Sequence, residues 1–173
     1  TGGTIMGVGK HLKGRNPAVE VVLADPEKSR LAGLVTQRDD PLKGEAVLAD
    51  VDAKIKATGG VAIEGAGKGE LTGIMNREGV PLKYVDRAIA VNDFDAFDEC
   101  RATAAAGLLV GGSAGLNVAA AKLVAAECAG QAPREGGVTI VTLLCDHGIK
   151  RAVPRHSTTP SLHTPHTDHL HPT

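Results

Sequence analysis

The stretch Leu108-Leu109-Val110-Gly111-Gly112-Ser113-Ala114-Gly115 joins a short apolar run to an alanine-rich segment that continues to about Ala129. Three apolar residues before a glycine-rich turn predict a very short strand, and the alanine-rich segment beyond the turn predicts a helix. A strand that passes through a tight turn into a helix is typical of proteins in which strands and helices alternate. The stretch therefore indicates the fold class and places Ser113 between a strand end and a helix start.

The segments on both sides repeat this alternation. Residues 84–91 alternate in polarity and predict a strand, and Asn92 or Asp93 can cap a helix that continues to about Ala106. Residues 138–145 form an apolar run that predicts another strand. Strands joined by crossovers of helical length predict an α/β fold, with a parallel sheet covered by helices on both faces.

The amino-terminal part of the chain fits the same fold. Thr1-Gly2-Gly3-Thr4 leads into a helical pattern over residues 5–13, and Gly14 is expected to end that helix. Residues 19–24 are mostly apolar and β-branched, which predicts a buried strand, and Asp25-Pro26 marks the turn beyond it. We expect one domain over residues 1–150.

Two parts of the chain lack a clear pattern. Residues 36–62 contain charges and proline or glycine breaks, so we interpret them as a surface excursion with an ambiguous helical stretch near residues 46–56. Residues 151–173 contain five of the seven histidines and four prolines, and we expect a disordered tail or a shifted reading frame there. A metal site in this tail is the alternative, which the prolines argue against, and we assign no metal site. Its ligands would be His163, His166, His169 and His171.

Composition excludes several classes of protein. Hydrophobic residues make up 42% of the 173 residues but aromatic residues only 2%, so the core must be built from small aliphatic side chains. The formal net charge of -1 and scattered basic residues argue against a nucleic-acid partner. No apolar run approaches the roughly 20 residues of a membrane span. The three widely spaced cysteines, Cys100, Cys128 and Cys145, are expected to be reduced thiols of a cytoplasmic protein.

Three glycine-rich stretches resemble phosphate-binding motifs, but the second and third each lack a residue that their motif requires. Thr1-Gly2-Gly3-Thr4 before a helix can form an anion cradle from free backbone amides, although a simple turn is an equally good interpretation of this tetrapeptide alone. A dinucleotide fingerprint that used Gly7 and Gly9 would need a third glycine at position 12, but the chain has Leu12 there. A P-loop over residues 65–69 would need Ser or Thr after Lys68, where the chain has glycine.

The turn around Ser113 also fits the G-x-S-x-G pattern of a hydrolase nucleophile elbow. An elbow needs an acid and then a histidine farther along the chain. The candidates are the adjacent Asp146 and His147 or the biased tail, from which a triad is not convincingly assembled. A serine hydrolase is therefore a weaker alternative.

Taken in order, these segments resemble the fold-type II pyridoxal-phosphate enzymes, the family of cysteine synthase and cystathionine β-synthase, over roughly residues 1–148. The resemblance implies the tryptophan synthase β-like fold and pyridoxal 5'-phosphate as cofactor. It also implies that Thr1, Gly2, Gly3 and Thr4 hold the cofactor phosphate and that Ser113 meets the pyridine nitrogen. Asp146 would lie near the ring edge, at the end of the last core strand. Gly65-Ala66-Gly67 would form the loop beside the substrate, with Ala66 in place of the usual isoleucine.

The resemblance further implies a β-replacement on an activated serine. We expect cysteine synthase chemistry, with O-acetylserine and sulfide; cystathionine β-synthase, with serine and homocysteine, and a non-catalytic remnant of the fold are the alternatives. We expect the chain to be the carboxy-terminal half of a longer homodimeric enzyme, because the family's Schiff-base lysine precedes the phosphate loop. No catalytic residue is assigned, and the chain alone is expected to be inactive.

Overall fold

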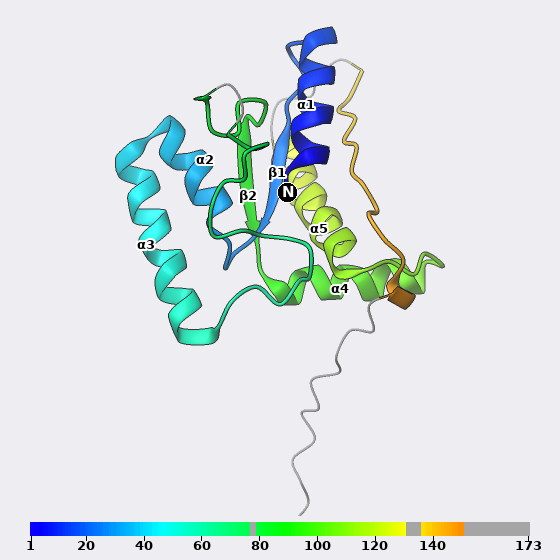
Figure 1. Ribbon diagram of the computed structural model, residues 1–173. Coiled ribbons are helices and arrows are strands. Elements are labelled where there is room, and N and C mark those ends of the chain that lie inside the picture. The colour runs from blue at the N-terminus through cyan, green and yellow to red at the C-terminus, as the bar shows by residue number, and fades with distance from the viewer. Residues whose placement is uncertain (77–78, 131–135, 151–173) are drawn as a thin grey trace, which may run out of the picture.

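The centre of the fold is a two-stranded parallel sheet in a computed structural model that describes residues 1–76, 79–130 and 136–150. Strand β1 (Val22–Pro26) pairs with β2 (Arg87–Val91), with Val22 opposite Arg87 and Pro26 opposite Val91. Because parallel neighbours need a crossover, the chain passes through two helices and a long loop before it returns as β2 (Figure 1). The α/β class is confirmed.

One face of the sheet is covered by α1 (Gly3–Arg15) and α2 (Leu31–Asp39). Their buried side chains form one cluster with the sheet and with the loop before β2. The members of this cluster are Met6, Leu23, Leu31, Val35, Met75, Leu82 and Val85. Their aliphatic character follows from the low aromatic content of the chain.

The opposite face is covered by α5 (Gly112–Ala129), and α4 (Asp93–Ala105) packs against α5 at the carboxyl end of the strands (Figure 1). Here the second cluster contains Ile63, Val91, Ala96, Leu116, Ala119 and Ala120. Consecutive residues of β1 belong to different clusters, because successive side chains of a strand point to opposite faces: Leu23 contributes to the first and Ala24 packs against the second. The predicted layers, with helices on both faces of the sheet, are confirmed.

The irregular excursion predicted over residues 36–62 is mostly helical, and the ambiguous helical stretch near residues 46–56 lies within a longer helix. After α2, helix α3 (Pro41–Thr58) lies outside α2 and away from the sheet (Figure 1). Asp40 caps this helix by accepting a hydrogen bond from the Lys43 amide at 3.1 Å, and Pro41 occupies the first turn. Gly44 lets α3 approach α2, since a Cβ there would lie closer than 3.0 Å to the Gln37 backbone. The proline that was interpreted as a break thus lies in the first turn of the helix, and the glycine allows the helix to pack against α2.

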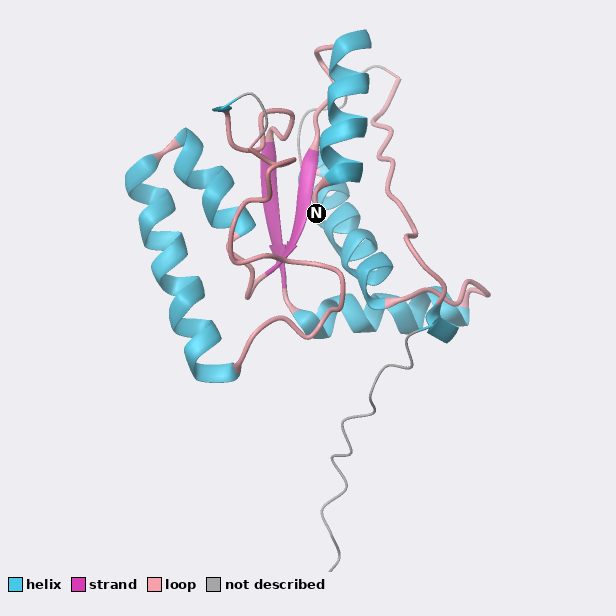
Figure 2. Cartoon of the chain, viewed as in Figure 1, coloured by secondary structure: helices cyan, strands magenta, loops and turns pink. Residues whose placement is uncertain are grey.

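The predicted strands over residues 108–110 and 138–145 are also wrong. Val110 forms only an isolated antiparallel bridge with His147, and residues 138–145 have no regular secondary structure (Figure 2). An apolar composition favours an extended backbone, but a strand also needs a partner, and within the described residues no strand lies beside this segment. Its side chains are accordingly exposed, with Val141 at 84% and Leu143 at 51%.

Helix α2 was not predicted, and Asp25-Pro26, predicted as a turn, forms the end of β1. The other predicted elements agree with the structure apart from their ends. The first helix continues past Gly14 to Arg15, and Asn92 caps α4 by accepting a hydrogen bond from the Asp95 amide at 2.9 Å. The strand expected at 84–91 begins only at Arg87. The expected tail, residues 151–173, lies outside the described residues, so the boundary at residue 150 stays a prediction.

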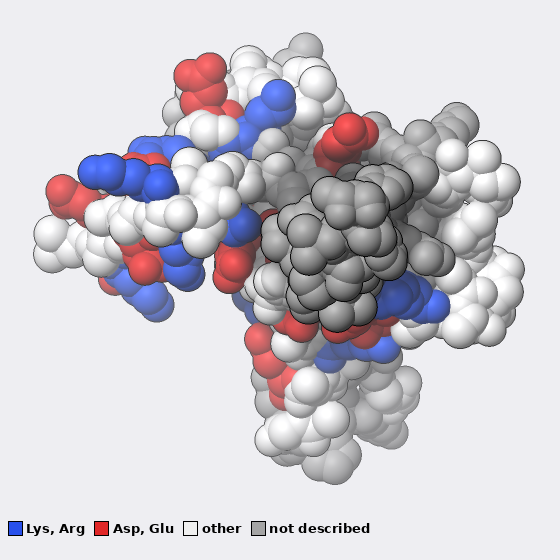
Figure 3. All heavy atoms as spheres, turned by 90° about the horizontal axis from the view of Figure 1, so that it is seen from below, with Lys and Arg blue, Asp and Glu red and all other residues white. Residues whose placement is uncertain are grey.

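The distribution of charge and the hydropathy of the helices concern the kinds of partner that the chain can bind. Acidic and basic side chains are interspersed over the face seen in Figure 3, including the part formed by α3, in keeping with the net charge of -1. In the described parts of the chain, none of the helices combines the length and the hydropathy needed to cross a bilayer.

Candidate functional site

The first component of the site is the start of α1. Gly2 caps this helix with a left-handed backbone (φ 81°), which glycine adopts without strain. The first helical hydrogen bond is donated by the Met6 amide to the Gly2 carbonyl at 3.0 Å, so the amides of Gly3, Thr4 and Ile5 have no acceptor within the helix. No acidic side chain stands in the first turn to neutralise the helix dipole. This donor set fits an anion such as the phosphate of pyridoxal phosphate.

The loop before α1 is held by residues that the sequence did not point to. The Thr72 hydroxyl donates a hydrogen bond to the Thr1 carbonyl at 2.7 Å. Met75 is buried against Gly2, where an added Cβ would lie 2.6 Å from the Met75 Cγ. Thr1, Gly3 and Thr4 remain exposed. The cradle is therefore supported from beneath and open to solvent.

The second component is the turn at the start of α5. Gly111 precedes the helix and Ser113 is its second residue, as the sequence predicted. Ser113 is half-buried, and within the described residues its hydroxyl makes no hydrogen bond. The hydroxyl can therefore serve a ligand. Whether it faces the same ligand as the start of α1 stays a prediction.

The glycine-rich loop at residues 63–67 lies directly beside this turn. Ile63 is 2% exposed, and its Cγ2 would lie 3.4 Å from a Cβ added at Gly112. Ala66 packs against the same cluster as Ile63, while Gly65 and Gly67 have positive φ values of 78° and 76°. The structure thus brings the predicted substrate loop to the start of α5.

Asp146 lies on the other side of the turn. The Gly111 amide donates a hydrogen bond to the Asp146 carbonyl at 3.2 Å, and a Cβ on Gly111 would lie closer than 3.0 Å to the Asp146 carboxylate. The residue reaches this place from an extended segment, not from the predicted core strand. The structure therefore brings Asp146 beside the turn, and its role at the ring edge stays a prediction.

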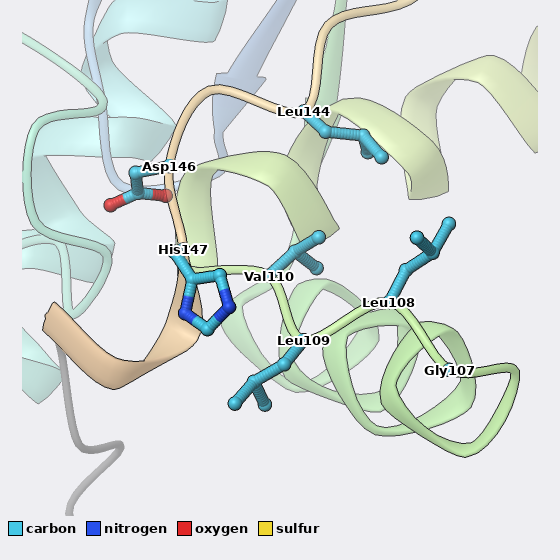
Figure 4. Close-up of a pocket in the computed structure, with 7 residues that line it drawn as sticks. All are labelled: Gly107, Leu108, Leu109, Val110, Leu144, Asp146 and His147. Carbon is cyan, nitrogen blue, oxygen red and sulfur yellow. The ribbon is translucent and has the colours of Figure 1, made fainter.

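The hydrolase alternative gains no support from the described residues. The exposed His147 accepts a hydrogen bond at Nδ1 from the Ile149 amide at 3.2 Å, so that nitrogen is occupied by its own segment. Asp146 and His147 line an open hollow of about 450 Å³ whose lining does not include Ser113 (Figure 4). The other lining residues are Gly107, Leu108, Leu109, Val110 and Leu144.

Buried charges at the carboxyl end of β1 are a feature that the sequence did not predict. Asp25 is 1% exposed, and burial raises its pKa from 3.8 to about 6, although its Oδ2 accepts a hydrogen bond from the Ala32 amide at 2.8 Å. Just after β1 and β2, respectively, Lys28 and Asp93 form an ion pair at 3.2 Å with both side chains largely buried. Asp25-Pro26 was recognised only as a turn, because a sequence does not report burial.

Comparison with known proteins identifies the family. The family of pyridoxal-phosphate dependent enzymes matches residues 1–146, a span that includes both helix starts and Asp146. Cysteine synthase B of Campylobacter jejuni is 34% identical over 125 residues, covering 72% of this chain and 33% of that protein. Cysteine synthase 2 of Schizosaccharomyces pombe is 31% identical over 155 residues, covering 87% of this chain and 35% of that protein. The chain thus spans about a third of the length of these relatives.

Solved structures agree with this assignment. The crystal structure of O-ureido-L-serine synthase superposes with a TM-score of 0.58 at 25% sequence identity, covering 86% of this chain and 37% of that one. A mutant of the same synthase with O-ureido-L-serine bound gives a TM-score of 0.57. Members of the family depend on pyridoxal phosphate, and the donor set at the start of α1 fits its phosphate. The chain belongs to the family of pyridoxal-phosphate dependent enzymes and has its type II fold.

Proposed function

We propose that this chain forms the phosphate-binding and substrate-loop part of a pyridoxal-phosphate enzyme that performs β-replacement, with the specificity of a cysteine synthase. The supporting observation is the meeting of the loop at residues 63–67, the Ser113 turn and Asp146 at the start of α5. These segments are distant in the chain, and the family match includes all of them. They contact one another at the start of α5, where a bound amino acid and the cofactor ring would lie in this proposal.

Each component has a definite task in this proposal. The amides of Gly3, Thr4 and Ile5 bind the phosphate dianion, and the hydroxyls of Thr1 and Thr4 add donors. Ser113 offers a neutral hydroxyl to the pyridine nitrogen, which favours the unprotonated ring nitrogen more than a carboxylate would. When bound, pyridoxal phosphate supplies the electron sink for chemistry at the α-carbon of an amino acid.

The loop at residues 63–67 orients the amino-acid substrate in this account. Positive φ values at Gly65 and Gly67 turn backbone amides in directions that other residues rarely reach, which suits contact with a small polar substrate. Ala66 leaves more room than the isoleucine usual in the family. O-acetylserine and sulfide are the substrates we favour, because both curated relatives are cysteine synthases.

The rest of the proposal concerns the whole enzyme. Cystathionine β-synthase activity and a non-catalytic role remain the alternatives. A homodimer and a cytoplasmic location are part of the proposal; all three cysteines are free, as expected of a reducing compartment.

No described lysine is assigned the covalent attachment of the cofactor. Lys13, Lys28 and Lys122 pair with Asp86, Asp93 and Glu99 at 2.7, 3.2 and 2.7 Å. An ammonium group held by a carboxylate is a poor nucleophile, since attack needs the neutral amine. These three lysines are therefore not candidates for the attachment, no motif of the family points to another described lysine, and the proposal for this chain is limited to binding and orientation.

Gly3→Asp tests the phosphate site. An acidic residue in the first turn of α1 favours the helix dipole but repels a phosphate, so folding should persist while affinity for pyridoxal phosphate falls at least about tenfold. Equilibrium dialysis measures this affinity. Pyridoxal, which lacks the phosphate, should bind both proteins equally weakly.

Leu42→Asp is the matched control. It adds the same charge to the first turn of α3, where the leucine is 81% exposed. Its affinity for pyridoxal phosphate should equal that of the unmodified chain. An equal loss in both variants, or no loss in Gly3→Asp, would contradict the proposal.

A further inference from the structure

The turn between β1 and α2 contacts the glycine-rich loop, and a buried serine hydroxyl makes two of the hydrogen bonds between them. Ser29 is 2% exposed, and its Oγ accepts a hydrogen bond from the Lys68 amide at 3.0 Å and donates one to the Lys68 carbonyl at 3.2 Å. The Arg30 amide donates a further hydrogen bond to the same carbonyl at 3.0 Å. Both polar groups of the Lys68 backbone are thus fixed by the turn.

Gly67 fits against the same serine. A Cβ at Gly67 would lie 2.9 Å from the Ser29 Cβ and 3.0 Å from the Val61 Cγ2, and its φ of +76° already favours glycine. The loop therefore rests on Ser29 by packing as well as by hydrogen bonds. Removing the hydroxyl takes this partner from the part-buried Lys68 amide, while the Lys68 carbonyl keeps only the Arg30 amide of the two groups that contact it.

The turn that carries Ser29 is itself rigid. The Ser29 amide donates a hydrogen bond to the Pro26 carbonyl at 2.8 Å, and Asp25 accepts one from Ala32 at 2.8 Å, so the residues around Ser29 are tied to the end of β1. The other end of the loop, at Ile63, packs beside Gly112. A chain of contacts thus leads from the sheet through Ser29 and the loop to the start of α5.

We propose that Ser29 is a positioning residue for amino-acid recognition: its hydroxyl fixes the loop at residues 63–69 against the start of α5, where the loop orients the substrate. The inference rests on the proposed function. Ser29 itself lies beneath the loop and touches neither substrate nor cofactor. Its loss should loosen the substrate side of the site and leave the phosphate side at α1 intact.

Ser29→Ala tests the inference by hydrogen exchange of the full 173-residue chain without cofactor. The amides of residues 63–69 should exchange about tenfold faster, while those of α5 remain unchanged. Thr36→Ala is the matched control, because the Thr36 hydroxyl donates a hydrogen bond to the Ala32 carbonyl of its own helix at 3.1 Å and, in the described part of the chain, to no residue of the loop. Unchanged exchange of the loop in Ser29→Ala, or equal acceleration in both variants, would overturn the inference. If Ser29→Ala does not fold, Ser29→Cys, which keeps the volume and weakens both hydrogen bonds, is judged by the same outcomes.

A binding measurement separates positioning from a general loss of stability. In Ser29→Ala the affinity for pyridoxal phosphate should stay within about twofold, whereas binding of L-serine to the cofactor-saturated chain should weaken about tenfold. Equal losses for both ligands, or no loss for L-serine, would count against positioning. If the unmodified chain fails to bind pyridoxal phosphate, the proposed function fails, and the exchange of the loop still decides the role of Ser29.

Discussion

Asp25 shows how one residue can set the pH dependence of the fold. Its carboxyl group is almost inaccessible, and desolvation outweighs the hydrogen bond from the Ala32 amide, so the pKa rises to about 6. A raised pKa means that the folded protein disfavours the ionised form. Asp25 therefore reduces stability as the pH rises from below 3.8 through about 6.

Asp25→Asn removes this titration and keeps an acceptor for the Ala32 amide. The free energy of unfolding of the variant minus that of the unmodified chain should increase by roughly 3 kcal/mol as the pH rises from about 3 to about 7. Urea denaturation at several pH values measures the difference. A difference that does not change with pH would show that Asp25 is not desolvated as described.

Asp39→Asn provides a control of opposite sign. The Arg38 guanidinium lowers the pKa of Asp39, so its ionised form stabilises the fold and this contribution disappears as the pH falls through the folded pKa. The variant should thus lose stability relative to the unmodified chain as the pH rises, by less than Asp25→Asn gains, because Asp39 is exposed.

At the scale of the elements, the contact between α4 and α5 depends on Gly115. A Cβ there would lie closer than 3.0 Å to the Ala96 carbonyl oxygen and the Cys100 Sγ, and the backbone atom cannot move independently of its helix. Helix propensity alone favours alanine by about 1 kcal/mol, whereas overpacking costs about 1–3 kcal/mol. The clash should outweigh the propensity.

Gly115→Ala should accordingly lower the free energy of unfolding. Gly14→Ala, in α1, is the matched control, because nothing lies within 4 Å of its added Cβ, and it should raise stability by up to about 1 kcal/mol. Thermal unfolding of both variants measures the effects. A stabilised Gly115→Ala would mean that α4 and α5 do not pack as closely as the structure shows.

The sequence predicted those elements in which the local residue pattern and the tertiary neighbours favour the same secondary structure. The helices α1, α4 and α5 and the strands β1 and β2 were found from apolar periodicity and capping residues. Only the middle of helix α3 was anticipated, because Pro41 and Gly44 look like breaks until their positions at the helix start and against α2 are known. Residues 138–145 have the composition of a strand, but composition does not supply the neighbouring strand that a ladder needs.

At the scale of the whole molecule, the order of motifs predicted more of the site than any motif alone. The sequence placed Ser113 at the start of a helix, as the structure has it, while the resemblance placed Asp146 at the cofactor's ring edge, which stays a prediction. It could not reveal Thr72, Met75 or the role of Ser29, because these residues support the loops through contacts between distant segments.

The central claim is that the start of α1 and the start of α5 serve one pyridoxal-phosphate site. Titrating the ¹⁵N-labelled chain with pyridoxal phosphate tests it most directly, with pyridoxal as the control without phosphate. The amide resonances of Gly3, Thr4 and Ile5 should shift together with those of Gly112 and Ser113, with a single midpoint, and pyridoxal should leave the first group unmoved. Shifts confined to the hollow at Leu108 and Leu109, or different midpoints for the two helix starts, would contradict the claim.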